Sequence, residues 1–209
     1  MHFHFYKYQG TGNDFIIADN RGQAYSGLTR EQINALCNRR FGIGADGLML
    51  LNTLEGYDFE MKYYNADGKE GSMCGNGGRC ITKFAYHQGI HREMYHFLAS
   101  DGPHEAEIDI DGIVSLKMKD VDHIRKFHND FILNTGSPHY IRLVKKVMDL
   151  DVYAKGHEIR YSRDFADDGI NVNFVEQQEN SNKIKVRTYE RGVEDETYSC
   201  GTGVTAAAL

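Results

Sequence analysis

Two short segments of the sequence place a cysteine directly before a glycine-rich turn. Residues 73–79 read Met-Cys-Gly-Asn-Gly-Gly-Arg and residues 199–205 read Ser-Cys-Gly-Thr-Gly-Val-Thr, so both contain Cys-Gly-x-Gly at the expected start of a helix. The first N–H groups of a helix have no partner within it, so such a turn binds anions. The same positive potential is expected to lower the pKa of Cys74 and Cys200, which makes both candidate bases or nucleophiles.

A matched pair of thiols indicates a different chemistry from a single one. Covalent catalysis by one cysteine requires a histidine within reach, and neither turn has a histidine beside it in sequence. Two thiols on opposite sides of one α-carbon can remove its proton from one face and return a proton to the other. The pair therefore predicts racemisation by two bases without a cofactor, because a thiol pKa lies near the operating pH in both directions.

The surroundings of the two turns divide the chain into similar halves. Each turn follows a polar cluster that ends a strand pattern, Tyr-Asn-Ala-Asp-Gly at residues 64–68 and Tyr-Glu-Arg-Gly at residues 189–192. Strand alternation lapses in the charged stretch at residues 117–126. We therefore expect one domain at residues 1–119, carrying Cys74, and a second at residues 120–209, carrying Cys200.

Most of the remaining pattern is typical of strands. Alternation of apolar and polar residues predicts strands at residues 3–8, 59–63, 105–110 and 184–188. A capping box at Thr29 and Gln32 predicts one short helix, and a second is expected from Gly75 to about His87, with Gly89 as its C-terminal cap. A third begins after Cys200 and has no end signal before Leu209, so we expect the chain to be truncated there and the second domain to be incomplete.

Composition excludes several classes of protein. The 209 residues include 22 glycines and only two prolines, and the net charge of −6 comes with no basic cluster that would indicate nucleic-acid binding. No apolar run approaches the ~18 residues of a membrane span, and the first residues lack the features of a signal peptide. The expected location is the cytoplasm, where all four cysteines would be thiols.

The glycines and cysteines give weaker support for a dinucleotide site or a zinc site. Residues 42–47 match Gly-x-Gly-x-x-Gly, but a helix precedes them and a strand pattern follows, which reverses the context of a dinucleotide site. Cys74 and Cys80 are separated by five residues, more than zinc sites usually allow, so no metal is predicted. Cys37 and Cys80 accompany apolar helix positions and are expected in the core.

At these motifs the sequence resembles the diaminopimelate epimerase family. The resemblance extends over the whole chain and rests on ordered segments at residues 5–15, 42–47, 64–68, 73–77, 136–139, 170–174, 189–192 and 199–203. It implies an α/β (α+β) fold of two pseudo-symmetric domains, each a curved, mostly antiparallel sheet wrapped around a central helix. It also implies interconversion of LL- and meso-diaminopimelate, for lysine and peptidoglycan precursors, without pyridoxal phosphate or another cofactor.

The resemblance assigns roles residue by residue. Cys74 and Cys200 would be the two bases, and His139 and Glu190 would tune them. Side chains of Asn13, Asn65, Asn171, Glu190 and Arg191, together with the backbone amides of Gly75, Asn76, Gly201 and Thr202, would bind the substrate. Ser137 stands where many members have asparagine and Gly47 where some have glutamine, which leaves the contacts to the distal end of the substrate open.

Two other functions compete with this one. A cofactor-free racemase of the same architecture could act on proline or hydroxyproline, although Arg191 and the asparagines favour a longer di-acid. A silent protein could retain the two turns only as anion-binding nests. Asparagines beside turns often serve their own backbone, and His139 could be an ordinary residue at the start of a strand. A homodimer is left open.

Overall fold

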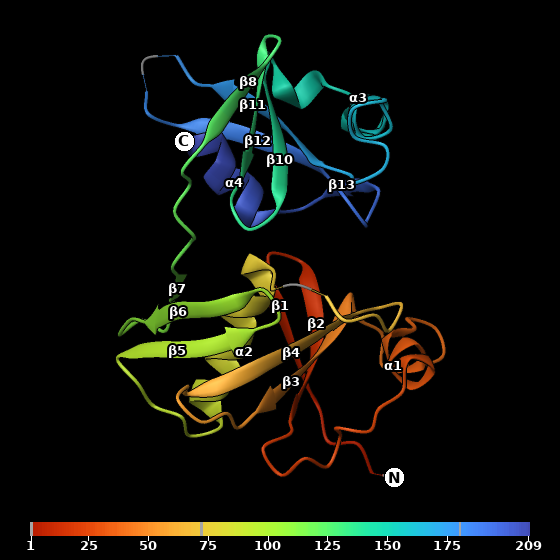
Figure 1. The fold of residues 1–209 in the computed structure, drawn as a ribbon, viewed down its shortest axis with the longest axis vertical. Helices are drawn as coiled ribbons and strands as arrows, with labels where there is room; N and C mark the ends of the chain where they lie inside the picture. Colours follow the sequence, from red (N-terminus) through yellow and green to blue (C-terminus); the bar gives the residue numbers. More distant parts are fainter. Residues whose placement is uncertain (1, 72, 180) are drawn as a thin grey trace. The chain divides into compact units, whose positions relative to one another are not determined.

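The computed structural model describes residues 2–71, 73–179 and 181–209, which form two compact units (Figure 1). The first unit ends at Lys117 and the second begins at Met118. Sequence patterning placed this division two residues later, after Lys119. No helix in the described part of the chain is long and apolar enough to cross a membrane.

The first unit is built on one sheet with the strand order β1-β2-β3-β4-β5-β6-β7. Only β2 with β3 and β4 with β5 pair in parallel, and the other neighbours are antiparallel. The elements are β1 (Tyr6–Gly10), β2 (Asn13–Asp19), α1 (Arg30–Cys37), β3 (Gly47–Asn52), β4 (Phe59–Asn65), α2 (Gly75–His87), β5 (Met94–Ala99), β6 (Gly102–Ile108) and β7 (Val114–Leu116).

Helix α2 forms the centre of this unit. Its apolar residues Ile81, Phe84 and Ala85 are fully buried, as the helical spacing predicted. The helix contacts strands at both ends of the sheet, β1 and β7, which requires the sheet to curl around it. Successive residues of β2 point to opposite faces, so Ile17 packs in the α2 cluster while Ile16 packs in the α1 cluster.

The second unit has a six-stranded sheet with the order β13-β12-β11-β10-β9-β8, in which only β10 and β11 pair in parallel. One face packs against α3 through Val172 and Phe174, and the other packs against α4 through Val175. The elements are β8 (Ile124–Phe127), β9 (Asp130–Asn134), β10 (Pro138–Leu143), η1 (Val147–Asp149), α3 (Val152–Arg160), β11 (Asn171–Gln177), β12 (Ile184–Glu190), β13 (Asp195–Thr197) and α4 (Gly201–Ala208).

The two units share one path of the chain. In each, a strand runs through a helical connection to a parallel neighbour, an antiparallel strand follows, and the next helix begins at the glycine after a cysteine. The path is β2-α1-β3-β4-α2 in the first unit and β10-η1-α3-β11-β12-β13-α4 in the second, where η1 and β13 are additions to the shared path. The predicted α/β fold class, with two curved sheets and few helices, is confirmed.

Local signals gave most element boundaries. The capping box of α1 is present, because the Thr29 side chain accepts from the backbone of Gln32 and the Gln32 side chain accepts from the backbone of Thr29. The predicted first strand is partly wrong, because β1 begins at Tyr6 rather than Phe3. Helix α3 was not predicted. It contains Gly156, which lowers helix propensity but lies so close to Tyr189 that a Cβ would be 2.3 Å from that side chain.

Candidate active site

Cys74 is the N-cap residue of α2. Its backbone is extended (φ −110°, ψ 150°), and the N–H of Gly77 donates a hydrogen bond to Sγ at 3.2 Å. The sulfur thus takes the place that a serine or aspartate oxygen usually occupies at a helix start. A negative charge on this sulfur would be stabilised by that N–H and by the helix dipole.

Asn13 and Asn76 line the same turn. Asn13 Oδ1 lies 3.9 Å from Cys74 Sγ and accepts from Asn76 Nδ2 at 3.4 Å. The other end of the Asn13 amide donates to Asp46 Oδ2 at 2.7 Å, so Asp46 determines that the oxygen, not the nitrogen, faces the thiol. Arg79 donates to Asn76 Oδ1 at 2.6 Å and holds that side chain in turn.

A charged cluster behind Asn13 keeps Asp46 in place. Arg39 Nη2 lies 2.6 Å from carboxylate oxygens of both Asp14 and Asp46, and Lys7 contacts Asp14 at 2.7 Å. Burial alone would raise the pKa of Asp14, but the hydrogen bonds from Arg39 and Lys7 outweigh it and lower this pKa to about 2. Asp14 is therefore ionised throughout the physiological range and anchors the cluster.

Asn65 is the exposed last residue of β4 and pairs with Gly47 at the start of β3. A Cβ at Gly47 would lie 2.5 Å from the Tyr63 ring and 2.6 Å from the Tyr64 carbonyl oxygen. Space around this strand end therefore excludes the glutamine that some relatives were expected to carry at position 47.

Cys200 is the N-cap residue of α4 and is more buried than Cys74, with 8% of its surface exposed. Its Sγ lies 3.5 Å from the Thr202 hydroxyl. Burial, and next to it the Glu190 carboxylate, raise the pKa of the Cys200 thiol. The expectation of a lowered pKa is therefore wrong for Cys200, because desolvation outweighs the hydrogen bonds from the Thr202 side chain and the Gly203 backbone, which lower the pKa.

Asn171 connects two other predicted site residues of the second unit. Its Nδ2 donates to Ser137 Oγ at 2.9 Å, and its Oδ1 accepts from the backbone N–H of Arg191 at 2.8 Å. The Arg191 side chain is exposed, and its guanidinium donates to the Asp168 carbonyl at 3.0 Å. The Ser137 hydroxyl at this position is thus an acceptor for the Asn171 amide.

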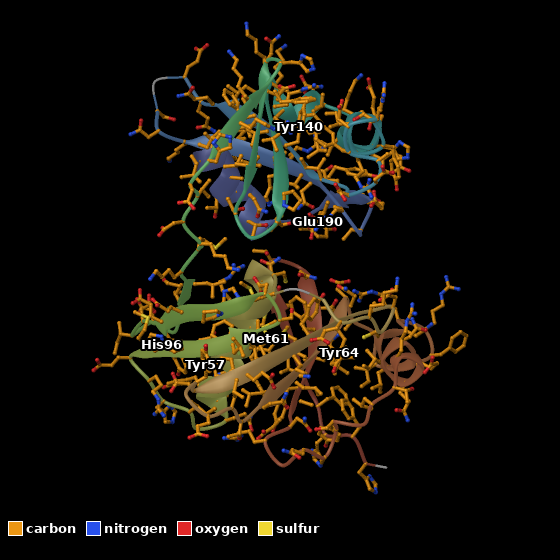
Figure 2. The ribbon with its side chains drawn as sticks, viewed as in Figure 1. Tyr57, Met61, Tyr64, His96, Tyr140 and Glu190 are labelled. Carbon is orange, nitrogen blue, oxygen red and sulfur yellow. The ribbon has the colours of Figure 1, made fainter. Side chains whose placement is uncertain are left out.

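Glu190 is the last residue of β12, where Figure 2 labels it, and is half-buried. Thr197 Oγ1 donates to its Oε2 at 2.9 Å. The loop before β10 is tied to α4, because Thr135 Oγ1 donates to the Thr202 carbonyl at 2.8 Å. Ser137, Asn171, Glu190 and Arg191 thus lie at one end of the neighbouring strands β10, β11 and β12.

His139 is fully buried on β10, directly opposite Asn171 in the ladder. Its Nδ1 lies 3.1 Å from Asn173 Nδ2, and its Nε2 has no hydrogen-bond partner among the described residues. Burial, and next to it the positive charge of Arg191, lower the pKa of His139 to about 4. The imidazole is therefore neutral at neutral pH.

The depressed pKa of His139 predicts a pH dependence of stability. Between pH 6.5 and 4 the unfolded chain binds a proton at His139 that the folded chain excludes. The contribution of His139 to the free energy of unfolding therefore falls by about 3 kcal/mol as the pH falls through that window. Above pH 6.5 we expect the contribution of His139 to the free energy of unfolding to stay constant. Urea unfolding at several pH values would measure it, as the difference between wild type and His139→Gln.

Exposed His91 provides the matched control for that measurement, since His91→Gln removes a histidine without a buried ring. The wild-type and His91→Gln curves should run parallel from pH 6.5 to 4. If the free energies of unfolding of wild type and His139→Gln also changed in parallel with pH, the buried imidazole would not resist protonation.

Comparison with known proteins decides the family. The family model described as diaminopimelate epimerase matches residues 5–124 and 131–209. The chain belongs to the diaminopimelate epimerase family. The diaminopimelate epimerase of Flavobacterium psychrophilum is 50% identical over 204 residues, covering 98% of this chain and 79% of that protein. That of Chlorobaculum tepidum is 48% identical over 207 residues, covering 96% and 80%.

Solved structures agree at the level of the fold. A Bacillus anthracis phenazine biosynthesis protein of the PhzF family matches with a TM-score of 0.67 at 15% identity, covering 99% of this chain and 78% of that one. A protein described as a probable proline racemase from Agrobacterium radiobacter matches with a TM-score of 0.62 at 15% identity, covering 98% and 76%. The diaminopimelate epimerase family thus shares its two-sheet fold with proteins of other names.

Sequence reasoning missed two residues that contact predicted site residues. Asp46 and Asn173 lie behind Asn13 and His139 and determine how those side chains are oriented. A signal for Asn173 was present, because residues 170–174 alternate Ile-Asn-Val-Asn-Phe and place two amides on one face of a strand. Asp46 gave no local signal, because its partner is 33 residues away.

Proposed function

We propose that this chain is a cofactor-independent epimerase that interconverts LL- and meso-diaminopimelate, a step toward lysine and peptidoglycan precursors. The observation that carries the proposal is that each unit places one thiol at the N-cap of a helix after the same chain path. Homologues named diaminopimelate epimerase are 37–50% identical over nearly the whole chain. We place the reaction in the cytoplasm, where the thiols stay reduced.

The proposed step is a proton exchange at the α-carbon. One cysteine, as thiolate, takes the α-proton, and the C–H electron pair remains on the substrate as a carbanion. The other cysteine, as thiol, gives its proton to the opposite face and becomes the thiolate. The raised pKa of Cys200 supports its role as the thiol before reaction, since its buried sulfur holds the proton more tightly than a free cysteine.

The carbanion forms beside an already anionic carboxylate and requires stabilisation. We assign this to the backbone N–H groups of Gly75 and Asn76 at the start of α2 and of Gly201 and Thr202 at the start of α4. Preorganised donors that meet developing charge contribute about 3–4 kcal/mol each in other enzymes. Two helix starts supply enough donors to hold the reacting carboxylate and its growing charge together.

The distal amino-acid end of the substrate is assigned to the polar side chains. The Arg191 guanidinium is exposed and planar, which suits bidentate recognition of a second carboxylate. Asn13, Asn65, Asn171, Ser137 and Glu190 complete the proposed contacts, and His139 acts beneath them. A proline racemase would have no use for a second carboxylate site, so Arg191 favours the di-acid over that alternative.

The purified chain should epimerise LL-diaminopimelate and exchange the α-hydrogen with solvent deuterium, whereas proline and hydroxyproline should show neither reaction. Proton NMR of each substrate in D2O measures both outcomes. If the chain epimerised proline but not diaminopimelate, its function would be that of a proline racemase. Binding of diaminopimelate without any deuterium exchange would indicate a silent binding protein.

A further inference from the structure

The orientation of the Asn173 side chain is determined by its backbone neighbours. Asn173 Nδ2 lies 3.2 Å from the Tyr140 carbonyl oxygen and 3.5 Å from the Asn171 carbonyl oxygen, and both of these atoms can only accept. Its Oδ1 accepts from the Thr188 hydroxyl at 2.9 Å. Reversing the amide would place two oxygens against each other, so the nitrogen must face these carbonyls.

This orientation determines the tautomer of His139. Asn173 Nδ2 is a donor and lies 3.1 Å from His139 Nδ1, so Nδ1 must be the unprotonated, accepting nitrogen. The neutral ring then carries its hydrogen on Nε2. That N–H is buried and has no partner among the residues that the structure describes, and an unpaired buried donor costs about 1–3 kcal/mol. A buried donor without a partner among the described residues is available to a bound ligand.

The face of the sheet that carries this donor lies beneath α4. His139 and Ile141 are two residues apart on β10, so their side chains share one face, and Ile141 packs with Ala206 of α4. The Asn173 side chain also lies beside the turn that carries Cys200. A Cβ at Gly203 would lie 2.3 Å from Asn173 Oδ1 and 3.2 Å from Cys200 Sγ.

The corresponding positions in the first unit are apolar. There a Cβ at Gly77 would lie 3.2 Å from Cys74 Sγ and 3.4 Å from the terminal methyl carbons of Met49 and Met61. Met49 holds the ladder position that Asn173 holds in the second unit, on the middle strand of the same chain path. The pair of Asn173 and His139 is therefore not repeated at these positions of the first unit, and the shared fold does not require it.

We infer that Asn173 is a positioning residue that locks His139 as its Nε2–H tautomer and thereby presents a permanent neutral donor to the substrate bound at Cys200. This inference rests on the proposed function for its catalytic consequence, but the tautomer itself follows from contacts within the chain. The low pKa of His139 supports it, because a ring that stays neutral keeps one nitrogen as acceptor and one as donor.

Nitrogen-15 NMR of the labelled full chain at pH 7 tests the tautomer directly, with His139→Gln identifying the signal among the ten histidines. We expect Nδ1 of His139 to have the shift of an unprotonated nitrogen and Nε2 that of a protonated one. The opposite assignment, or an exchanging mixture of tautomers, would overturn the inference even in a fully active enzyme. The expected spectrum in an inactive chain would leave the inference standing and remove the proposed function.

Two variants separate positioning from stability. Asn173→Leu keeps the volume and removes the donor, whereas Thr188→Val removes a neighbouring hydrogen bond and leaves the donor to His139 intact. Outer-shell partners that fix a histidine tautomer contribute about 10–100-fold in activity at metal sites, and we expect a loss of kcat in that range for Asn173→Leu. Thr188→Val should lower the unfolding midpoint without shifting the His139 signals.

The comparison of Asn173→Leu with Thr188→Val can contradict the positioning role. Equal kcat losses in the two variants, with unchanged His139 shifts in both, would show that Asn173 acts only through stability. If Asn173→Leu fails to fold, the wild-type spectrum alone decides the inference.

Discussion

Cys74→Ala and Cys200→Ala should each reduce epimerisation by about 10²–10⁴-fold, the range attributed to one general acid or base. The reason is geometric, because inversion needs a base on one face of the α-carbon and an acid on the other. Neither role can pass to the second pair of cysteines. Cys37 and Cys80 are buried, and burial raises the pKa of each thiol to about 11.

Deuterium exchange distinguishes a folded variant that lacks one catalytic thiol from a variant that does not fold. A variant with one remaining thiolate can still remove the α-proton from one stereoisomer and return deuterium to the same face. We therefore expect Cys200→Ala to exchange hydrogen without inversion for one stereoisomer, and Cys74→Ala for the other. Cys37→Ala is the matched control and should keep most of its kcat, because Cys37 is a buried member of the α1 cluster and its thiol has no role in the proposed proton transfer.

Measurement is by NMR in D2O with each pure stereoisomer. Full racemising activity in either alanine variant would refute the two-base scheme. Loss of both exchange and inversion for both stereoisomers, with a normal unfolding midpoint, would assign the missing cysteine to a covalent step instead.

The sequence predicted those parts of the structure that depend on neighbours along the chain. The α1 capping box, the stripe Ile81–Phe84–Ala85 and the alternation in β4 and β12 are all local patterns, and each appears where expected. Helix α3 lacked such a signal, because its interior Gly156 is required by close packing on Tyr189, which lies 33 residues further along. Propensity was overridden there by a tertiary contact.

The chemistry of the site was less predictable than its residue types. The turns at Cys74 and Cys200 look alike in sequence, yet Gly77 faces two methionine side chains and Gly203 faces the buried amide of Asn173. The raised pKa of Cys200 comes from burial, which no local pattern reports. Asp46 and Asn173 act across strand pairs, so their roles depend on register between segments that are distant along the chain.

The difference between the two turns gives the second large prediction. Gly203→Ala should strongly impair the enzyme, because its Cβ would lie 2.3 Å from Asn173 Oδ1, and that side chain is fully buried and held by hydrogen bonds on both ends. Forced overpacking of this kind costs about 1–3 kcal/mol in stability. Any shift of Asn173 or Cys200 adds a loss of kcat, which we expect to reach about 10²-fold because misplacement by an ångström can cost that much.

Gly77→Ala is the matched variant at the same position of the other turn. Its Cβ would meet Cys74 Sγ at 3.2 Å and the flexible ends of Met49 and Met61 at 3.4 Å, and methionine side chains adapt readily to such a change. Urea unfolding and steady-state kinetics on both variants should therefore show a much larger loss of stability and kcat for Gly203→Ala. Equal losses would mean that the two turns rest on equally adaptable surroundings, which would remove the physical basis for different roles of the two thiols.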